Sequence, residues 1–362
     1  MNYYIFGAHP RGWTLYQYLK TLEPERNILG FFYNNDEKNP EKIESIRVRF
    51  LDNKTEDLDI SAEVFVATRG IFHEKIIEDL KAVGFKKITP VTPSMDIDLR
   101  NRYVKDFYEA KGRTFEKIDE LKVLESKSKE KEVKTCIYIA KTVFDAPFQK
   151  PVDINEYEKI IQAGSALSEN KLTEASFYDD NRENISNKNQ QFCELTALYW
   201  IWKHSSDDII GFEHWRRRFI LPEKWDEIML NNGIDVILPV PLCVMPSLED
   251  NYKSRHDSKV WEKGMEILKK HHPEDYEVAV RFFKESNLYS PCNMIIAKRE
   301  VLKEYCDWLF PVLLELNDTI GILDDKYQNR YPGFISERLL NYFFEKNQDR
   351  FKIVYADKSF LS

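Results

Sequence analysis

Two adjacent aspartates and a run of amide and hydroxyl side chains precede a strongly apolar helical segment. Asp179, Asp180, Asn184 and Ser186 lie in this polar stretch, and apolar residues at helical spacing predict a helix over residues 189–203. Side chains of these types can line a pocket that binds a donor substrate beside the helix N-terminus. Asn and Ser also favour turns and helix caps, so a cap at the start of this helix is the competing interpretation.

A second group of chemically useful side chains follows the apolar segment 208–212. It consists of one histidine and three consecutive arginines, His214, Arg216, Arg217 and Arg218. Adjacent cations repel one another unless an anion or carboxylates lie among them. If the segment continues as a strand, Arg216 and Arg218 share a face with His214, and Arg217 points to the other face.

This basic cluster has two interpretations. Guanidinium groups bind phosphate oxygens through two parallel hydrogen bonds, so the arginines can hold a diphosphate. Alternatively they pair with nearby carboxylates, for which the sequence offers Glu213, Asp226 and Glu227. His214 can bind a sugar hydroxyl or a phosphate, although a lone histidine at a strand end is commonly structural.

Carboxylates suited to acid–base chemistry stand towards the end of the sequence. Glu337 follows a predicted turn at Gly333 and is expected at the start of a helix, where it faces a pocket as a general base or serves the helix dipole. Asp324 and Asp325 are the second candidates for the base. The candidates for binding an acceptor or sugar hydroxyl are Asn293, which precedes a buried strand, and Arg338.

The elements that must position these residues alternate between short apolar strands and helices. In the first part, strands are predicted over residues 3–6, 28–32, 63–67 and 87–90, with helices over 13–20 and 74–83. Later strands are predicted over 135–140, 208–212, 235–241 and 294–298, with a helix over 299–316. This alternation predicts an α/β fold whose ligand site lies at the C-terminal ends of the strands.

The turn after the first strand reads Gly-Ala-His-Pro-Arg-Gly over residues 7–12. It keeps the first and last glycines of the G-x-G-x-x-G dinucleotide fingerprint. His9 replaces the middle glycine, which normally lets the backbone approach a pyrophosphate, and Pro10 removes an amide donor. The sequence therefore predicts a Rossmann-like fold that binds no dinucleotide.

Length and charge limit the classes of protein that fit. The 362 residues predict about two domains, and the net charge of -8 leaves no overall positive field to attract nucleic acid. No apolar stretch reaches the roughly 20 residues of a membrane-spanning helix, and no leader pattern opens the sequence. The five cysteines are scattered and never form a C-x-x-C pair, which is typical of a cytoplasmic protein with reduced thiols.

A strongly charged segment divides the sequence. Residues 116–132 read EKIDELKVLESKSKEKE, which is typical of a solvated helix or linker. We therefore predict a Rossmann-like domain over residues 1–98, a charged helical linker over 99–134 and a second α/β domain over 135–362.

Five motifs of the second domain, taken together, resemble a known family. They are DD-x-x-x-N-I-S, C-E-L-T-A-L-Y-W-x-W-K, G-x-x-H-W-R-R, N-M-x-I-x-K-R and G-F-x-S-E-R-L-L. In this order they resemble a bacterial glycosyltransferase family from capsule, exopolysaccharide and O-antigen gene clusters, which includes galactofuranosyltransferases. The family usually has Thr-Gly-Asp after the aspartate pair, whereas this chain has Asn181, Arg182 and Glu183. The exchange puts the identity of donor or acceptor in question.

The resemblance implies a GT-A-like glycosyltransferase domain, that is, one with the nucleotide-diphospho-sugar fold. It implies a hexosyltransferase that moves a sugar from a nucleoside-diphosphate sugar to a growing cell-surface glycan or its lipid-linked precursor, with UDP-linked galactofuranose as the first donor to test. Such an enzyme is expected in the cytoplasm, in peripheral contact with the inner face of the membrane. The alternative is a non-catalytic sensor of nucleotides or sugars.

GT-A enzymes usually hold a divalent metal through a D-x-D motif after a central strand. No such motif follows Ile210, and the basic cluster stands in its place. We therefore expect Arg216 with Arg217 or Arg218 to supply the positive charge that a metal would give to the departing diphosphate. The alternative is a divalent metal held by the pair Asp179 and Asp180, which requires a turn to bring their carboxylates together.

Overall fold

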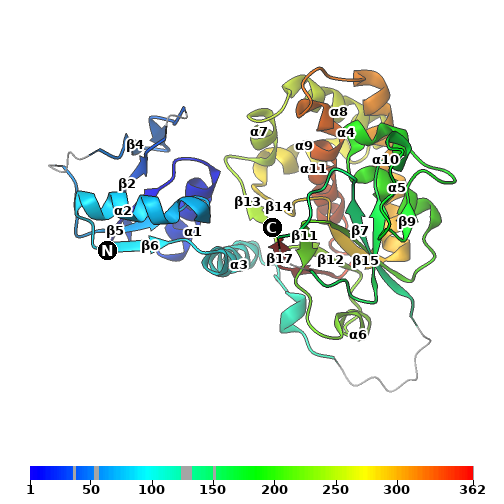
Figure 1. The fold of residues 1–362 in the computed structure, drawn as a ribbon, viewed down its shortest axis with the longest axis horizontal. Helices are drawn as coiled ribbons and strands as arrows, with labels where there is room; N and C mark the ends of the chain where they lie inside the picture. Colours follow the sequence, from blue (N-terminus) through cyan, green and yellow to red (C-terminus); the bar gives the residue numbers. More distant parts are fainter. Residues whose placement is uncertain (36–37, 53–56, 124–132, 150–151, 362) are drawn as a thin grey trace. The chain divides into compact units, whose positions relative to one another are not determined.

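The computed structural model describes residues 1–35, 38–52, 57–123, 133–149 and 152–361. The chain divides into two compact units, Met1–Thr114 and Phe115–Ser362, whose elements are labelled in Figure 1.

The first unit is built on a six-stranded sheet in the order β3-β4-β2-β1-β5-β6, in which only β3 and β4 pair in the antiparallel sense. Its strands are β1 (Asn2–Phe6), β2 (Asn27–Tyr33), β3 (Lys42–Ile43), β4 (Ile46–Phe50), β5 (Glu63–Val66) and β6 (Lys87–Pro90). Its helices are α1 (Pro10–Leu22), α2 (His73–Val83) and α3 (Pro93–Ala110). The predicted α/β alternation is confirmed here.

Apolar side chains on both faces of this sheet hold the helices. On one face, α2 buries Ile76 and Leu80 in a core with strand residues such as Phe32. On the other face, α1 lies against the sheet, and Tyr18 of α1 contacts Tyr103 of α3 with ring centroids 5.1 Å apart. Because α3 packs on α1, the first unit extends to Thr114 and not to the predicted boundary at residue 98.

The tight turn at residues 7–12 leads directly from β1 into α1. Gly7 adopts a positive φ of 123°, and a Cβ on Gly12 would lie 1.9 Å from the Gly7 carbonyl oxygen, so no larger residue fits there. Pro10 begins α1, where a missing N–H costs nothing, and His9 is the N-cap residue without a side-chain cap bond. The close approach of the two glycines explains why both ends of the fingerprint are glycine.

The second unit is built on a larger mixed sheet. Its strands are β7 (Thr135–Lys141), β8 (Glu158–Gln162), β9 (Phe177–Tyr178), β10 (Ile209–His214), β11 (Arg217–Phe219), β12 (Val236–Pro239), β15 (Ile295–Lys298), β16 (Ile353–Ala356) and β17 (Lys358–Phe360), and a separate pair is β13 (Leu242–Cys243) with β14 (Leu288–Tyr289). The main path runs β9-β8-β7-β10-β15-β12-β16, and β11 and β17 extend β10 at one end. Every pair on the main path is parallel except those of β15, which runs against both of its neighbours.

Helices cover both faces of this sheet. They are α4 (Asn189–Phe192), α5 (Leu195–His204), α6 (Trp225–Asn231), α7 (Leu248–Lys253), α8 (Ser258–His271), α9 (Tyr276–Glu285), α10 (Arg299–Ile320) and α11 (Tyr331–Lys346), with short 3-10 turns η2 (Ile118–Glu120), η3 (Ser165–Leu167), η4 (Ser186–Lys188) and η5 (Gln328–Arg330). On one face, α6 and η2 pack on isoleucines of the central strands. On the other face, α10 lies on β10 and β15, with α5 and α11 packed against it.

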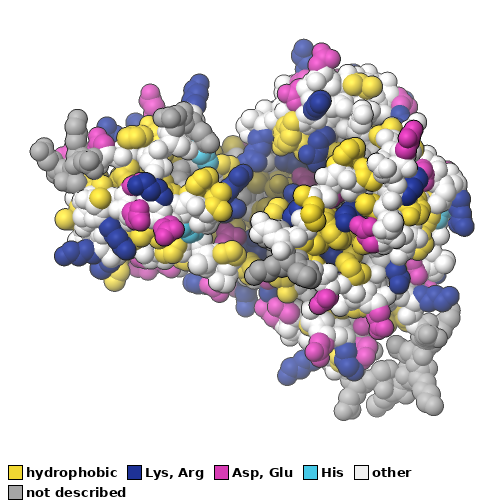
Figure 2. Space-filling model, in the orientation of Figure 1, with side chains coloured by type: hydrophobic (Ala, Val, Ile, Leu, Met, Phe, Trp, Pro, Cys, Tyr) yellow, Lys and Arg dark blue, Asp and Glu magenta, His cyan; other side chains and the backbone are white. Residues whose placement is uncertain are grey.

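The charged segment between the predicted domains is divided in the structure. Phe115 stacks on Tyr355 with ring centroids 5.1 Å apart, and Lys117 pairs with Asp357 at 2.8 Å, so both belong to the second unit. Residues 124–132 of the predicted linker lie outside the described residues. Side chains of both charge signs are spread over the visible face of each unit in Figure 2, so an anionic ligand needs a local basic cluster.

Candidate functional site at the strand ends

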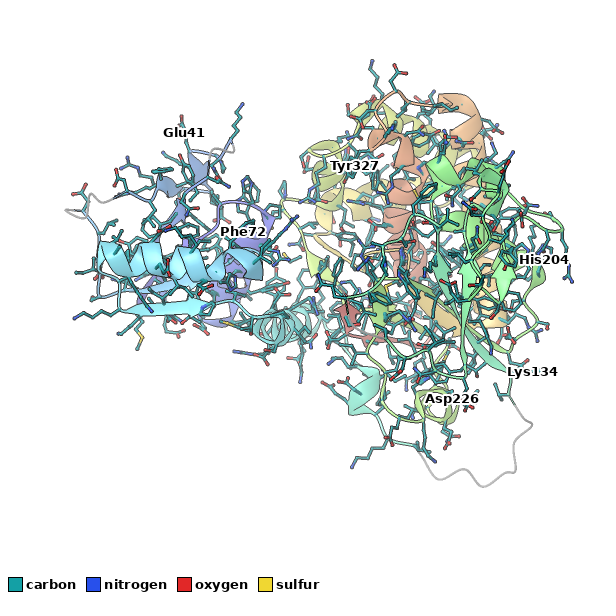
Figure 3. All side chains as sticks on the ribbon, viewed as in Figure 1. Glu41, Phe72, Lys134, His204, Asp226 and Tyr327 are labelled. Carbon is teal, nitrogen blue, oxygen red and sulfur yellow. The ribbon has the colours of Figure 1, made fainter. Side chains whose placement is uncertain are left out.

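One edge of the second sheet gathers most of the predicted site residues. The parallel strands all end there, and β15 begins there because it runs the other way. The opposite edge holds the strand starts, marked in Figure 3 by Lys134, whose N–H donates to Asp208 at 3.1 Å. In open α/β sheets the ligand crevice lies outside the C-terminal ends, where the strand order reverses. In this sheet that point lies between the ends of β7 and β10.

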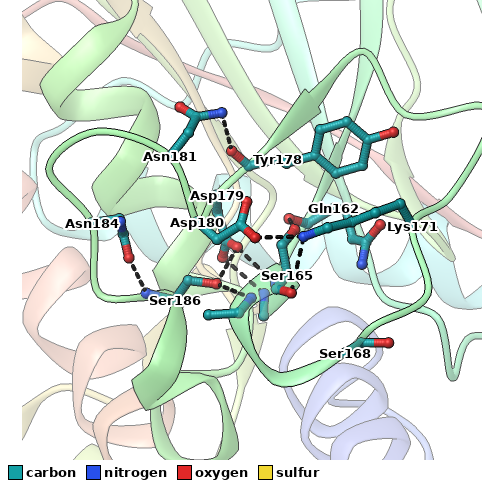
Figure 4. A network of polar contacts seen from close by, with 12 residues as sticks. Gln162, Ser165, Ser168, Lys171, Tyr178, Asp179, Asp180, Asn181, Asn184 and Ser186 are labelled. Atoms are coloured by element: carbon teal, nitrogen blue, oxygen red, sulfur yellow. Dashed lines mark hydrogen bonds and ion pairs between the residues drawn. The ribbon is translucent and has the colours of Figure 1, made fainter.

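Asp179 is at this edge, but its carboxylate is used within the protein (Figure 4). It is fully buried and accepts hydrogen bonds from the Gly164 N–H at 2.8 Å, the Ser165 N–H at 2.9 Å and the Ser186 hydroxyl at 2.5 Å. The Ser186 oxygen also accepts from the Ala166 N–H at 3.0 Å. The predicted donor-binding role of Asp179 and Ser186 is therefore not supported, because both side chains hold the loop after β8. Ser186 does not cap the following helix either.

The neighbours of Asp179 are also engaged locally. Asp180 pairs with Lys171, and Asn184 donates to the Arg182 carbonyl at 2.8 Å and accepts from the Ser186 N–H. A divalent cation needs several free oxygen ligands. Asp179 and Asp180 offer no such pair, so these residues do not fit the two-carboxylate metal site considered as the alternative.

Another group of ligand-type side chains lies between α8 and α9. His272, Glu274 and Asp275 converge within 4.8 Å. His272 Nε2 bonds to the Trp308 carbonyl at 3.0 Å, and Asp275 already accepts from the Trp308 indole at 3.0 Å and pairs with Lys346. This group is therefore engaged in joining α8, α9, α10 and α11.

The loop after β8, which Asp179 holds, contacts the first residue of α4. Gly164 has a φ of +67°, and a Cβ there would lie 2.5 Å from Asn189. The Asn189 amide donates to the Cys193 carbonyl at 2.7 Å and to the Thr196 hydroxyl at 2.9 Å. These bonds stabilise a break at Cys193, whose φ of 49° and ψ of -127° end α4. The single helix predicted over residues 189–203 is therefore wrong, since the backbone turns at Cys193 before α5 begins.

The break at Cys193 directs Glu194 towards the start of β15. Glu194 Oε1 accepts from Asn293 Nδ2 at 3.0 Å, and the same amide donates to the Gly333 carbonyl at 3.2 Å. Asn293 is 1% exposed, and it follows Cys292 in a turn where both residues have positive φ. Asn293 thus lies in the turn before β15 beside Glu194, which was not among the residues singled out in the sequence.

Glu337 reaches the same turn from α11. Its Oε1 accepts from the Cys292 N–H at 2.9 Å, and its Oε2 pairs with Arg338 at 3.0 Å. Burial raises its pKa, and the nearby charge of Glu194 raises it further, while Arg338 acts in the opposite direction. The prediction that Glu337 lies in the first helical turn is wrong. Pro332 is compatible with a helix start, so α11 begins at Tyr331 and Glu337 lies in its second turn.

The three consecutive arginines lie on a tight hairpin and not on one strand. His214 at the end of β10 pairs with Arg217 at the start of β11, so these two share a face of the sheet. The predicted alternation, with Arg216 and Arg218 beside His214, is therefore wrong, because the chain reverses at residues 215–216. His214 Nε2 donates to the Cys292 carbonyl at 2.5 Å, which leaves Nδ1 for another partner.

Arg218 is buried in an ion cluster. It is 6% exposed and contacts Glu158 at 2.5 Å and Glu213 at 2.6 Å. Burial raises the pKa of Glu213 to about 7, against the opposing effect of Arg218. Arg218 therefore matches the carboxylate-pairing interpretation with Glu213, and it is not available to a diphosphate. The other predicted partners, Asp226 and Glu227, lie on α6 instead.

Arg216 and Arg217 differ from Arg218. Arg216 donates to the carbonyls of Ala146 at 2.8 Å and Leu361 at 3.3 Å, and it joins two chain segments. Arg217 lies over the Phe360 ring at 5.4 Å, and no described carboxylate pairs with it. Arg217 lies opposite His214, which holds the Cys292 turn. Lys358 of β17 lies opposite Phe219, two residues after Arg217, so Lys358 and Arg217 share one face of this strand pair. Of the three arginines, Arg217 has the free charge at the site.

The remaining predicted residues lie on the surface or bond within the protein. Asp324 and Asp325 are exposed, and Asp325 accepts from the N–H groups of Tyr327 and Gln328 at the start of η5. Arg338 is 3% exposed, and it donates to Asn251 at 3.1 Å besides its pair with Glu337. The predicted contact of Arg338 with the acceptor is therefore not supported. Arg338 instead holds the Glu337 carboxylate in place.

The strand order of the second unit is 3-2-1-4-6-5-7 with the sixth strand antiparallel, when its strands on the main path are numbered along the chain. This α/β arrangement, with its polar site at the strand ends, is GT-A-like, as predicted. The chain belongs to the family described as "Domain of unknown function (DUF4422)", whose model matches residues 146–348, more than half of the chain.

Comparison with solved structures gives a similar protein, entitled "WbbM bifunctional glycosytransferase apo structure". The two share 26% sequence identity with a TM-score of 0.54, over 63% of this chain and 45% of that one. This chain thus matches less than half of the length of that protein. No curated protein matches the chain. In the described residues, no helix is long and apolar enough to cross a membrane.

Proposed function

We propose that the second unit is a glycosyltransferase, which moves a sugar from a nucleoside-diphosphate sugar to an acceptor hydroxyl. The observation that carries the proposal is the group of charges around the Cys292 turn. Glu337 accepts from the Cys292 N–H at 2.9 Å, and Glu194 accepts from Asn293, the next residue, at 3.0 Å. His214 bonds to the Cys292 carbonyl and lies opposite Arg217 across the hairpin, and Lys358 shares a face of the β11–β17 pair with Arg217. Two cations and two carboxylates therefore surround one turn at the ligand-binding edge of the sheet.

Glycosyl transfer requires both kinds of charge. A cation stabilises the negative charge that develops on the departing diphosphate, and a carboxylate removes the proton of the attacking hydroxyl. Arg217 has no described carboxylate partner, and His214 lies opposite it across the hairpin. We assign the diphosphate to Arg217, with Lys358 as a further contact, and we assign no step to a metal.

The likeness to a bifunctional glycosyltransferase supports this class of reaction. Within it we propose a hexosyltransferase that uses a UDP-sugar, with galactofuranose as the first sugar to test. The proposed acceptor is a growing cell-surface glycan or its lipid-linked precursor, which places the protein at the cytoplasmic face of the membrane.

Incubation of the purified chain with a panel of UDP-sugars, including UDP-galactofuranose, tests the proposal. We expect release of UDP that increases when a galactoside acceptor is added, and no loss of release when a chelator is added. Thermal stabilisation by a nucleotide sugar without release of UDP would instead support the non-catalytic sensor. A chain that neither releases UDP nor is stabilised would contradict both functions.

A further inference from the structure

Glu194, between α4 and α5, is the carboxylate at the strand ends that keeps an oxygen for a substrate. We propose that this oxygen takes the proton of the acceptor hydroxyl during sugar transfer. The inference rests on the proposed function and names the residue for its proton-transfer step. It also gives Glu337 a different task from the one expected from the sequence.

The two carboxylates differ in how their oxygens are used. Glu337 accepts from the Cys292 N–H with one oxygen and pairs with Arg338 through the other. Glu194 accepts from Asn293 with Oε1, and no donor in the described part of the chain bonds to Oε2. Glu194 is also only partly buried, so this oxygen has access to a ligand. Glu337 is therefore a positioning residue that fixes the Cys292 turn, and Glu194 is free to accept a proton.

Asn293 supplies a second, independent observation. Its Nδ2 donates to two groups that can only accept, the Glu194 carboxylate and the Gly333 carbonyl, and this fixes the orientation of the amide. Its Oδ1 is then a buried acceptor, and no described group donates to it. A buried acceptor without a partner destabilises the fold. A sugar hydroxyl beside Glu194 would satisfy this atom, and Asn293 would then position the acceptor.

Backbone strain supports the same assignment. Cys193, Cys292 and Asn293 have φ values of 49°, 76° and 51°, although none of them is glycine. A non-glycine residue in this conformation is strained and persists only where its surroundings impose it. The three residues form the two turns that bring Glu194 and Asn293 together. The fold therefore maintains two strained turns at the contact between these side chains.

The proposed step is balanced without a further reactant. The acceptor oxygen forms a bond to the anomeric carbon of the donor sugar, and the bond from that carbon to the diphosphate oxygen breaks. The electron pair leaves with the nucleoside diphosphate, whose charge is met by Arg217, and the hydroxyl proton moves to Glu194 Oε2.

Glu194→Gln tests the assignment, because an amide oxygen at this position still accepts from Asn293 but is not basic. We expect a 10²–10⁴-fold loss of kcat for transfer from UDP-galactofuranose to an octyl galactoside, the range of general-base catalysis. UDP affinity and the melting temperature should remain within error of the wild type. Glu183→Gln is the matched control, since Glu183 is an exposed carboxylate whose partners are Lys203 and Tyr199.

Chemical rescue separates proton transfer from positioning. Added formate should restore transfer to Glu194→Ala, because it supplies a small carboxylate in the vacated space, and it should not restore Glu337→Ala. If formate rescues only Glu337→Ala, or if Glu194→Gln turns over at the wild-type rate, the assignment of Glu194 is overturned. The proposed function still stands in both cases if the wild type is active. A wild type that turns over none of the nucleotide sugars overturns the proposed function, and this assignment with it.

Discussion

Two polar clusters lie at the strand ends, the Asp179 cluster (Gly164, Ser165, Asp179 and Ser186) and the Glu194 cluster (Glu194, Asn293 and Gly333). They differ in how many of their hydrogen-bond acceptors have a donor. Each oxygen of Asp179 accepts a hydrogen bond from the protein, and three donors converge on it. Around Glu194, one carboxylate oxygen and the Asn293 Oδ1 lack a described donor, and three non-glycine residues have positive φ. The residues around Asp179 are fully hydrogen-bonded and support the fold, whereas those around Glu194 keep free acceptors, which is why we propose them as the substrate site.

The largest effect is expected from removal of the Asp179 carboxylate. Asp179→Ala leaves two backbone N–H groups and one hydroxyl without their acceptor in a buried site, which should lower the free energy of unfolding by roughly 3–5 kcal/mol. Urea denaturation measures it. The control is Asp180→Ala, which removes a partly exposed pair with Lys171 and should cost less than about 1 kcal/mol. Equal losses in the two variants would contradict the comparison.

Arg217 and Arg218 of β11 are expected to have different roles, Arg218 in stability and Arg217 in binding the diphosphate. Arg218→Met strips the counter-charge from Glu158 and Glu213 and should destabilise the chain by roughly 3–5 kcal/mol. Arg217→Gln should leave unfolding unchanged within about 0.5 kcal/mol and weaken UDP binding or turnover at least about 10-fold, as expected for a lost charge-assisted contact. Calorimetry measures the affinity for UDP, and urea denaturation measures the free energy of unfolding. A stable, fully active Arg217 variant would remove Arg217 from the diphosphate site.

Gly164 connects the two clusters, because its N–H donates to Asp179 and its Cα lies against Asn189, which holds the break before Glu194. Gly164→Ala forces a side chain into a left-handed position and against Asn189, and we expect a loss of roughly 2–3 kcal/mol, above the roughly 1–2 kcal/mol for a left-handed position alone. Gly233→Ala is the matched control, because Gly233 has a similar φ of +65° with no atom within 4 Å of the added Cβ. Transfer activity should fall only in the Gly164 variant, since Asn189 holds the break before Glu194.

The smallest effect expected is a dependence of the free energy of unfolding on pH, through His256. Burial lowers the pKa of His256 to about 4, and the charge of Arg338 acts in the same direction. The folded state therefore binds fewer protons than the unfolded state between pH 4 and 6.5, so stability falls as the pH falls through this range. From pH 7 to 5 the His256 contribution should be about 2 kcal/mol. Denaturation at both pH values should show this difference in the wild type, and His256→Gln should lack it.

The fold was largely predictable from the sequence because apolar periodicity reports on local structure. The alternation of strands and helices predicted the α/β class, and segments such as residues 135–140 and 294–298 correspond to β7 and β15. The reversal at residues 215–216 was missed because the arginines and Trp215 carry no glycine or proline turn signal. That omission placed Arg218 beside His214 and Arg217 away from it, the reverse of the observed pairing.

The site was predictable only in part, because its composition depends on which loops meet. In the sequence, the Asp179 carboxylate could bind a ligand. Only the structure shows that the loop after β8 folds back onto it and that both of its oxygens accept hydrogen bonds from the protein. Glu194 looks like an ordinary residue of the helix predicted over residues 189–203, and the positive φ at Cys193 that directs it has no sequence signal. Asn293 directly precedes a buried strand at the ligand edge and lies beside Glu194, while its contact with a sugar hydroxyl stays a prediction.

The different burial of Arg217 and Arg218 has a consequence for ionic strength. At 0.15 M salt, mobile ions screen charges over about 8 Å in solvent but act much less on buried pairs. The Arg218 cluster should therefore keep its strength in concentrated salt, whereas attraction of a diphosphate to Arg217 should weaken. A sodium chloride titration should thus inhibit the proposed sugar transfer at concentrations that leave the melting temperature unchanged.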